Sequence, residues 1–344
     1  MRGTTRFKEL DALRGIAALW VVLFHYLLRY DQIYHGVEPP LFGGLPIPDG
    51  LYAVNLFFTI SGFVILMTLR HCTGAADFIV SRFSRLYPAY WAAVALTSAM
   101  LFVLPLPDQH FSASRILVNL TMVQQYVFVD HVDGSYWSLT YELTFYAIML
   151  ALYLTGLLRR IETVCWVWLA LTLTATLLSY IGFPMPYRPQ LLLITPSAQF
   201  FIAGIIFYLA RHQGYTRNRI LLLGACLLAA YVTDPHEPAV VYAALSFIVI
   251  HLAITGRLTR LAASPVLQWL GAISYPLYLI HQIIGYRIIA TLLENDVPRP
   301  LVIVIVLSIV LALATLLSRT IERPAMRLIR QTYRRFAAVR LAVT

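Results

Sequence analysis

Arg14 and His25 lie in the first apolar segment of the chain, Leu10 to Tyr30, which is otherwise typical of a membrane-spanning helix. They are 11 positions apart. Since a helix has 3.6 residues per turn, both side chains project from one face, roughly 16 Å apart along the axis. Ala17 and Ala18 share much of this face and leave room for a molecule to lie against it. Ionisable residues inside a span are rare and generally functional, so this face is a candidate site.

Glu142 is a candidate partner for His25. It is the only acidic residue in the interior of any expected span, and it would lie about six residues into the fourth span from the outer side. His25 would lie about five residues from the outer end of the first span, so the two are expected at similar depth. An imidazole and a carboxylate together make a general base and its orienting group. The alternative is a structural carboxylate that neutralises a buried Arg or His.

Arg82 and Arg85 form an Arg-x-x-Arg-x-x-Pro pattern just before the third expected span. Their guanidinium groups are one helical turn apart and are expected to face the cytoplasm. Guanidinium groups bind phosphate through paired hydrogen bonds, so the pattern suits a phosphate-bearing substrate. The alternative is that they are only the positive charges that flank a span on its inner side.

Ser61 and His281 are weaker candidates. Ser61 precedes Gly62, and small residues of this kind let helices approach closely. No base is expected beside Ser61, which argues against a nucleophile. His281 lies in the middle of a span, after a break expected at Pro276. It could line a cavity or be a hydrogen-bonded structural residue, and it is the first alternative for orienting His25 if Glu142 is structural.

The composition indicates the elements that position these residues. Hydrophobic residues make up 60% of the 344-residue chain and charged residues only 12%, against about 25% charged in soluble domains. The three cysteines have no metal-like spacing, so we expect neither a metal site nor a disulfide framework. The net charge of +10 is spread between apolar segments, which argues for membrane topology and against nucleic-acid binding. The first segment is expected to be retained, since no signal-peptidase-like site follows it.

These patterns predict an all-α polytopic membrane protein with about ten transmembrane helices, each near the roughly 20 residues that a bilayer requires. The expected spans are 11–30, 52–70, 87–104, 136–157, 163–182, 192–211, 219–233, 239–256, 272–292 and 299–318. The stretch from Ile116 to Val129 is shorter and more polar, and we expect it to be interfacial or re-entrant.

The basic residues predict the orientation of these spans. With both termini in the cytoplasm, 20 Lys and Arg residues lie on the inner side and five on the outer side, with Arg14 in the membrane. An eleventh span would move the basic C-terminal tail outside. We therefore expect one membrane-embedded domain, 1–344, in the cell inner membrane, with its spans in 11–318 and a basic cytoplasmic tail at 319–344 on the inner leaflet.

The chain resembles the membrane acyltransferase type 3 family, and the matching motifs follow in order along nearly the whole chain. They are Phe7-Lys8-Glu9-Leu10-Asp11-Ala12-Leu13-Arg14-Gly15-Ile16-Ala17-Ala18, Arg14-x10-His25, Phe57-Phe58-x-x-Ser61-Gly62-Phe63, Arg82-Phe83-x-Arg85-Leu86-x-Pro88, Trp137-Ser138-Leu139-x-x-Glu142-x-x-Phe145-Tyr146, Gly271-x-x-Ser274-Tyr275-x-x-Tyr278-Leu279-x-His281 and Glu322-Arg323-Pro324. One departure is Leu143, where the family often has Trp; we expect only a change in packing.

The resemblance implies transfer of an acyl group, usually acetyl, from acyl-CoA to a hydroxyl of a sugar-containing acceptor. His25 would match the essential family histidine and Arg14 its paired arginine, while Arg82 and Arg85 would match the arginines that contact the donor. No permanently bound cofactor is expected, and acetyl-CoA is the donor substrate. The expected partners are acyl-CoA, a carbohydrate or glycolipid acceptor and the bilayer. The remaining candidates for lining the cavity are Asp11, Ser61, Trp137, Tyr141, Tyr275 and His281.

Two other classes fit some of these features. Ten spans with buried Arg, His and Glu could form a proton-coupled membrane transporter. Against this, the two halves of the sequence contain no corresponding pair of apolar segments interrupted by Gly or Pro. The polar groups also concentrate in the first four spans. A non-catalytic lipid-binding membrane protein would leave the expected pairing of His25 with Glu142 unexplained. An integral membrane O-acyltransferase therefore explains more of the sequence than either.

Overall fold

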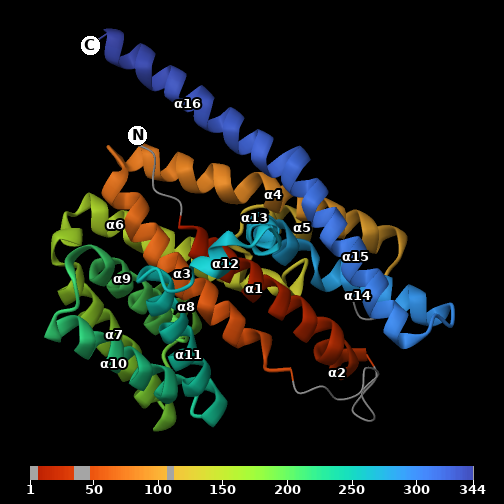
Figure 1. Ribbon diagram of the computed structural model, residues 1–344, viewed down its shortest axis with the longest axis horizontal. Coiled ribbons are helices and arrows are strands. Elements are labelled where there is room, and N and C mark those ends of the chain that lie inside the picture. The colour runs from red at the N-terminus through yellow and green to blue at the C-terminus, as the bar shows by residue number, and fades with distance from the viewer. Residues whose placement is uncertain (1–6, 35–46, 107–111, 344) are drawn as a thin grey trace. The chain divides into compact units, whose positions relative to one another are not determined.

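The computed structural model describes residues 7–34, 47–106 and 112–343, and all of the secondary structure in these residues is helical (Figure 1). Arg2 and Arg6, which contributed to the expected orientation, lie outside the described residues, as does Thr344 at the end of the expected cytoplasmic tail. A helical fold follows from the composition, because a helix pairs its own backbone groups and so tolerates apolar surroundings. The expected all-α class is confirmed.

The helices follow one another with short connections. They are α1 (Lys8–Phe24), η1 (His25–Arg29), α2 (Tyr30–Tyr34), α3 (Gly50–His71), α4 (Ala75–Val103), α5 (Ala113–Asn119), η2 (Gln124–Val127), η3 (Gly134–Tyr136), α6 (Trp137–Leu154), η4 (Leu157–Arg160), α7 (Ile161–Tyr180), α8 (Tyr187–Leu193), α9 (Ala198–Gln213), α10 (Arg217–Thr233), α11 (Glu237–Ile254), α12 (Thr259–Ala263), α13 (Pro265–Ile280), α14 (Gln282–Glu294), α15 (Arg299–Leu317), η5 (Ser318–Glu322) and α16 (Arg323–Val343).

Helices cover the ten segments expected to span the membrane. Within the described residues, six helices are long and apolar enough to cross a membrane, and the bent pair α13 and α14 would make a seventh. A shorter apolar helix covers Pro238–Ile254. The protein is therefore a helical protein with candidate membrane-spanning helices, and ten crossings with both termini in the cytoplasm stay a prediction.

The helices form two compact units, each assembled from separate parts of the chain. Unit 1 contains the described residues up to Ala17, Leu51–Ala75 and Ser138–Gly271. Unit 2 contains the described residues of Ala18–Gly50, Ala76–Trp137 and Ala272–Thr344. Several helices run from one unit into the other.

Unit 1 depends on close contacts between glycines. A Cβ atom on Gly62 of α3 would overlap the backbone oxygen of Phe201 in α9, and one on Gly204 of α9 would overlap that of Thr59 in α3. Small residues allow this approach of two helix backbones. Stacked aromatic rings flank the crossing, since the ring of Phe201 lies 4.3 Å from that of Phe145, centroid to centroid. These contacts fix α3, which carries Ser61, against α9.

Unit 2 contains a broken helix. α13 and α14 are bent by 73° at His281, whereas the sequence predicts the break at Pro276, which instead lies inside α13. Three side chains bond backbone groups near the break. The Tyr26 hydroxyl donates to the His281 carbonyl (2.7 Å), the Tyr136 hydroxyl donates to the Leu279 carbonyl (3.1 Å), and Asp133 accepts from the Ile283 amide (3.0 Å). A break inside a membrane protein requires such substitutes for the lost helical bonds.

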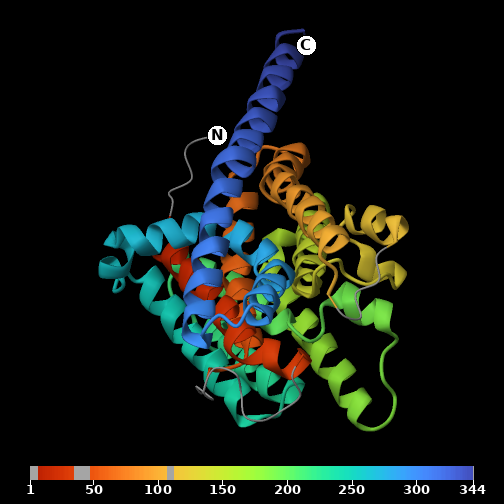
Figure 2. The same cartoon turned by 90° about the vertical axis from the view of Figure 1, so that its right-hand side faces the viewer.

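Two π-helical turns lie within the long helices of unit 2. η1 begins at His25 in the helix that contains α1 and α2, and η5 ends at Glu322 between α15 and α16. The second turn lets α15 continue as one long helix into α16, the blue helix that reaches the end marked C in Figures 1 and 2. Single π-helical turns occur frequently at functional sites, so both positions are of interest.

Candidate active site

His25 has a defined tautomer. Its Nδ1 atom lies 2.8 Å from the carbonyl oxygen of Val21, one turn earlier in α1. Because a carbonyl only accepts hydrogen bonds, Nδ1 carries the proton and Nε2 has the free lone pair of a base. Even without a carboxylate, this arrangement presents Nε2 for proton abstraction.

His281 lies against His25 at the break between α13 and α14. The two rings are edge to face, with centroids 4.8 Å apart and planes at 81°. The Nδ1 atom of His281 lies 2.8 Å from the Tyr278 carbonyl, so its Nε2 is an acceptor, and this Nε2 lies 3.4 Å from Nδ1 of His25. His281 is completely buried. The sequence offered His281 as a cavity-lining or structural residue and as the alternative to Glu142 for orienting His25, and the structure brings the two histidines together.

Asp133 and Ser135 support this arrangement from the segment before α6. The Oδ1 atom of Asp133 accepts from the amide (2.9 Å) and the hydroxyl (2.6 Å) of Ser135, and its Oδ2 accepts from the Ile283 amide in the first turn of α14. A carboxylate is favourable at a helix N-terminus. Burial nevertheless dominates and raises the pKa of Asp133 to about 6, opposed by the hydrogen bonds to the side chain of Ser135 and to the amides of Ile283 and Ser135.

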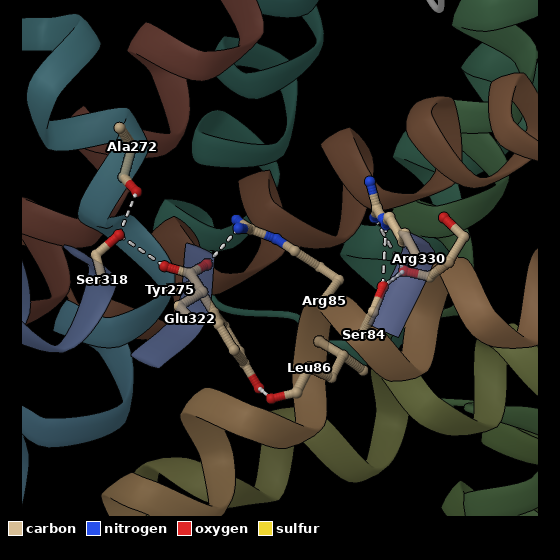
Figure 3. A network of polar contacts seen from close by, with 9 residues as sticks. Ser84, Arg85, Leu86, Ala272, Tyr275, Ser318, Glu322 and Arg330 are labelled. Carbon is tan, nitrogen blue, oxygen red and sulfur yellow. Dashed lines mark hydrogen bonds and ion pairs between the residues drawn. The ribbon is translucent and has the colours of Figure 1, made fainter. Parts of the chain in front are cut away.

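Arg85 forms an ion pair with Glu322, which connects α4 to η5 (Figure 3). Only 1% of the Glu322 side chain is exposed. Its second carboxylate oxygen accepts from the Ser318 hydroxyl at 2.8 Å. The guanidinium carbon of Arg85 also lies 5.6 Å above the ring of Tyr275, whose hydroxyl donates to the Leu86 carbonyl at 3.0 Å. Arg85 and Tyr275 stood out in the sequence, whereas Glu322 was noted there only as part of a family motif.

Arg82 and Arg330 meet at the same stretch of α4. An Nη atom of Arg82 donates to the Ser81 hydroxyl (2.9 Å). Arg330 of α16 donates from Nε to the Ser84 hydroxyl (3.0 Å) and from Nη2 to the Ser81 carbonyl (3.2 Å) (Figure 3). Sequence reasoning treated Arg330 only as tail charge and missed this contact. The spacing of Arg323, Arg327, Arg330 and Arg334 on one helical face is the signal that could have found it.

Glu142 lies in unit 1 and has partners there. The Ser61 hydroxyl donates to its Oε1 atom at 3.3 Å, and the Tyr146 hydroxyl, one turn later in α6, donates to the same atom. Ser61 therefore has a carboxylate beside it, although the sequence suggested no base there. Glu142 and His25 belong to different units, so their pairing stays a prediction that rests on their expected depth.

The remaining sequence candidates are divided between the two units. Asp11 and Arg14 lie in α1 within unit 1, where a Cβ on Gly271 would overlap the Asp11 carbonyl. Tyr141 lies in α6, with its ring centroid 6.3 Å from that of Phe58. Trp137 begins α6 and belongs to unit 2. Among the described residues, no group of three or more His, Cys, Asp or Glu side chains could hold a metal ion.

These features describe a helical protein with candidate membrane spans, a pair of histidines of which His281 is completely buried, and an arginine-rich helix contact in unit 2. The model of the acyltransferase domain family Acyl_transf_3 matches residues 7–319, and the chain belongs to this family.

Three relatives show what the chain is similar to. It is 25% identical to "Acyltransferase MdmB" of Streptomyces mycarofaciens, over 94% of this chain and 92% of MdmB. It is 23% identical to "Putative peptidoglycan O-acetyltransferase YrhL" of Bacillus subtilis, over 92% of this chain but only 54% of YrhL. It is 39% identical to "Protein 2 in picA locus" of Rhizobium radiobacter, over 33% of this chain and 56% of that protein. No solved structure matches the chain.

Proposed function

We propose that the chain is an integral membrane O-acyltransferase that moves an acyl group, acetyl in the first instance, from acyl-CoA to a hydroxyl of a carbohydrate-containing acceptor. The observation that carries the proposal is the geometry of His25, whose Nδ1–H is fixed by Val21 and His281 and whose Nε2 is available as a base. Membership of the acyltransferase family supports the same reaction class.

In this proposal His25 is the general base. Its Nε2 atom removes the proton of the acceptor hydroxyl as the oxygen attacks the thioester carbonyl of the donor. The new C–O bond forms and the C–S bond breaks, and the imidazolium returns the proton to the departing CoA thiolate. His281 is a positioning residue, because its Nε2 accepts from the Nδ1–H of His25 and so stabilises the tautomer and the imidazolium.

The donor is proposed to bind along unit 2. Tyr275 lies beside Arg85, and His281 lies beside His25. Tyr275 and His281 are six residues apart in sequence, and α13 covers this stretch up to Ile280. Six residues of helix correspond to about 9 Å. Phosphates at the arginines and a thioester near His25 could therefore belong to one extended donor molecule. Arg14 lies in unit 1, and its contact with the donor stays a prediction from the sequence.

The acceptor class is proposed from the names of the relatives. YrhL is named for peptidoglycan, and "Exopolysaccharide production protein ExoZ" of Rhizobium meliloti, which is 24% identical over 58% of this chain, is named for an exopolysaccharide. Both names refer to polymers that contain sugars, and the word O-acetyltransferase in the name of YrhL indicates a hydroxyl acceptor. We propose that the acceptor lies at the outer face of the inner membrane and that the donor arrives from the cytoplasm. Cysteine labelling of Cys72, expected only in permeabilised cells, tests this orientation.

A proton-coupled transporter is the second candidate, and the break between α13 and α14 favours it, since transporters use broken helices to build binding sites. Transporters of this kind usually contain two such breaks, and the described residues contain one bent pair. The deciding experiment is an incubation of the purified protein with radiolabelled acetyl-CoA. Release of acetate, or transfer to a glycan acceptor, supports the enzyme; an intact donor in the presence of cell-wall and exopolysaccharide acceptors contradicts it.

A further inference from the structure

The contact between α4 and α16 gathers positive charge in unit 2 around one short stretch of α4. Arg82 and Arg85 project from α4, and Arg330 reaches the same residues from α16, through bonds to Ser84 and to the backbone of Ser81. Figure 3 shows Arg330 bonded to Ser84 and Arg85 bonded to Glu322. Three guanidinium groups therefore converge where α16 lies on α4.

Arg85 is the arginine of this group that pairs with Glu322. The carboxylate is itself buried and bonded to Ser318, which fixes both side chains. A buried pair of this kind is costly to break, because the remaining charge would be left uncompensated. Arg85 is therefore well suited to hold α4 and η5 together and less suited to turn toward a ligand.

Arg330 is in the opposite situation. Its contacts within the described residues are two neutral oxygens, and the charged groups that act on it are Arg82, Arg85 and Arg334. A guanidinium group surrounded by others of its kind is relieved by an anion, and its planar fork suits a phosphate group. Arg330 is half-buried, so its side chain is held in place but still accessible to a ligand.

The rest of α16 fixes this arrangement. The Tyr333 hydroxyl donates to Asp77 at 2.8 Å, one turn before Ser81 on α4. The helices α4 and α16 run antiparallel, because residues later in α16 contact residues earlier in α4. The contacts are Tyr333 with Asp77, Arg330 with Ser81 and Ser84, and Glu322, just before α16, with Arg85. The C-terminal helix therefore presents Arg330 at a defined position and is more than a basic tail.

We propose that Arg330 and Arg82 bind the phosphate groups of the acyl-CoA donor, and that Arg85 positions α16 through its ion pair with Glu322. This proposal rests on the proposed function and divides the Arg82–Arg85 motif into a binding and a positioning arginine. It adds a residue of the C-terminal helix to the donor site. Anionic lipid headgroups offer the same phosphate chemistry, so the test must separate the two sources.

The experiment compares two donors, acetyl-CoA and acetyl-pantetheine, which lacks the nucleotide phosphates. In Arg330→Gln we expect the KM for acetyl-CoA to rise about 10- to 100-fold, as for the loss of a charge-assisted hydrogen bond, while the KM for acetyl-pantetheine stays at the wild-type value. Arg330→Lys should recover part of the loss. Arg327→Gln is the matched control, since Arg327 is exposed on the same helix and bonds the Arg323 carbonyl.

Tyr333→Phe tests whether the rise in the KM for acetyl-CoA comes only from weaker packing of α16 on α4. It removes the bond to Asp77 without removing charge, and because the ion pair of Arg85 with Glu322 still holds α16 on α4, it should leave the KM for acetyl-CoA within about twofold of wild type. An Arg330→Gln variant with an unchanged KM for acetyl-CoA, or with equal losses for both donors, would overturn the proposal. So would a Tyr333→Phe variant that reproduces the loss.

Direct binding of radiolabelled CoA in neutral detergent gives a readout that does not depend on turnover. Weaker binding by Arg330→Gln than by Arg327→Gln supports the proposal. If wild type binds CoA more tightly than Arg330→Gln does but transfers no acetyl group, the proposed function fails while the assignment of Arg330 to the phosphates of CoA stands. If Arg330→Gln binds CoA more weakly but phosphatidylglycerol as well as wild type does, the donor site stands. If Arg330→Gln loses only the lipid, the arginines belong to a headgroup site and the proposal is wrong.

Discussion

The Nε2 atom of His281 lies 3.4 Å from the Nδ1 atom of His25, at the point where α13 ends and α14 begins. The Nδ1–H of His25 is thus shared between a histidine 256 residues away and the Val21 carbonyl at 2.8 Å. Both partners only accept, so they select the same tautomer. The break in the helix is what lets His281 reach this position, and it gives the bend a part in the proposed chemistry.

His281 is predicted to set the rate of the chemical step without affecting donor binding. In His281→Leu the Nδ1–H of His25 loses one acceptor, and a neutral hydrogen bond is worth about 0.5–1.5 kcal/mol. We expect kcat to fall about 2- to 10-fold with the KM for acetyl-CoA unchanged, and His281→Gln, which retains an acceptor, to lose less. Steady-state kinetics in both variants check this; equal losses in the two would indicate a purely structural role.

Glu142 is predicted to act with His25. Glu142→Gln retains the shape but loses the charge, so it should be severely impaired while remaining folded. Because groups that act as one unit are non-additive, the double variant with His25→Ala should be little worse than the worse single variant. Tyr146→Phe is the control, since it removes one hydrogen bond from Glu142 and leaves the charge. Additive losses in the kinetics, or normal turnover in Glu142→Gln, would return Glu142 to a structural role with Ser61 and Tyr146.

The crossing of α3 and α9 is predicted to tolerate no side chain at Gly62. A Cβ there would overlap the Phe201 carbonyl, so the helices must separate and lose contacts along their length. Gly62→Ala should lower the thermal midpoint in detergent, or the yield of folded protein, by more than Gly224→Ala does. Gly224 lies in α10, where a Cβ would meet no neighbouring group within 4 Å. Equal midpoints for the two variants would show that the crossing is loosely packed.

Asp133 is predicted to make stability depend on pH. Its pKa in the folded protein is about 6, above the ordinary 3.8, so the folded state binds the proton more tightly than the unfolded state. Stability from this group is therefore fully present below about pH 4 and is lost as the pH rises through about 6. Asp133→Asn cannot titrate, and it retains only one of the two acceptor oxygens, so either the Ile283 amide or Ser135 loses its acceptor, which costs about 1–3 kcal/mol.

The measurement for Asp133 is the thermal midpoint of wild type and Asp133→Asn from about pH 4 to about pH 7, a range that brackets the pKa of the folded protein. The variant should have the lower midpoint, and the gap between the two proteins should narrow as the pH rises from about 4 to about 6. Parallel curves would show that Asp133 does not titrate in this range.

The helical class and the location of the helices followed from the sequence because long apolar segments have few alternatives in a membrane. The bend at His281 did not, since a Pro five residues earlier marks a weak point without giving the angle or the partners. Tyr26 and Asp133 satisfy the break from distant segments. Such long-range hydrogen bonds leave no periodic signal in the sequence.

The candidate site was predictable only in part, for the same reason. His25, Arg82 and Arg85 stood out because charged residues in or beside apolar segments are conspicuous. Glu322 and Arg330 were hidden in a basic tail, where positive charge already has an explanation in membrane orientation. Their contacts with α4 emerge only when α16 is placed antiparallel to it.

The central claim is that His25 is the general base, and the most direct measurement is acetyl transfer by purified His25→Ala. We predict that the variant inserts, purifies and binds acetyl-CoA like wild type, but transfers acetyl about 10²- to 10⁴-fold more slowly, as expected for the loss of general-base catalysis. Turnover within a few-fold of wild type would contradict the claim, because the reaction would then proceed without the Nε2 atom of His25.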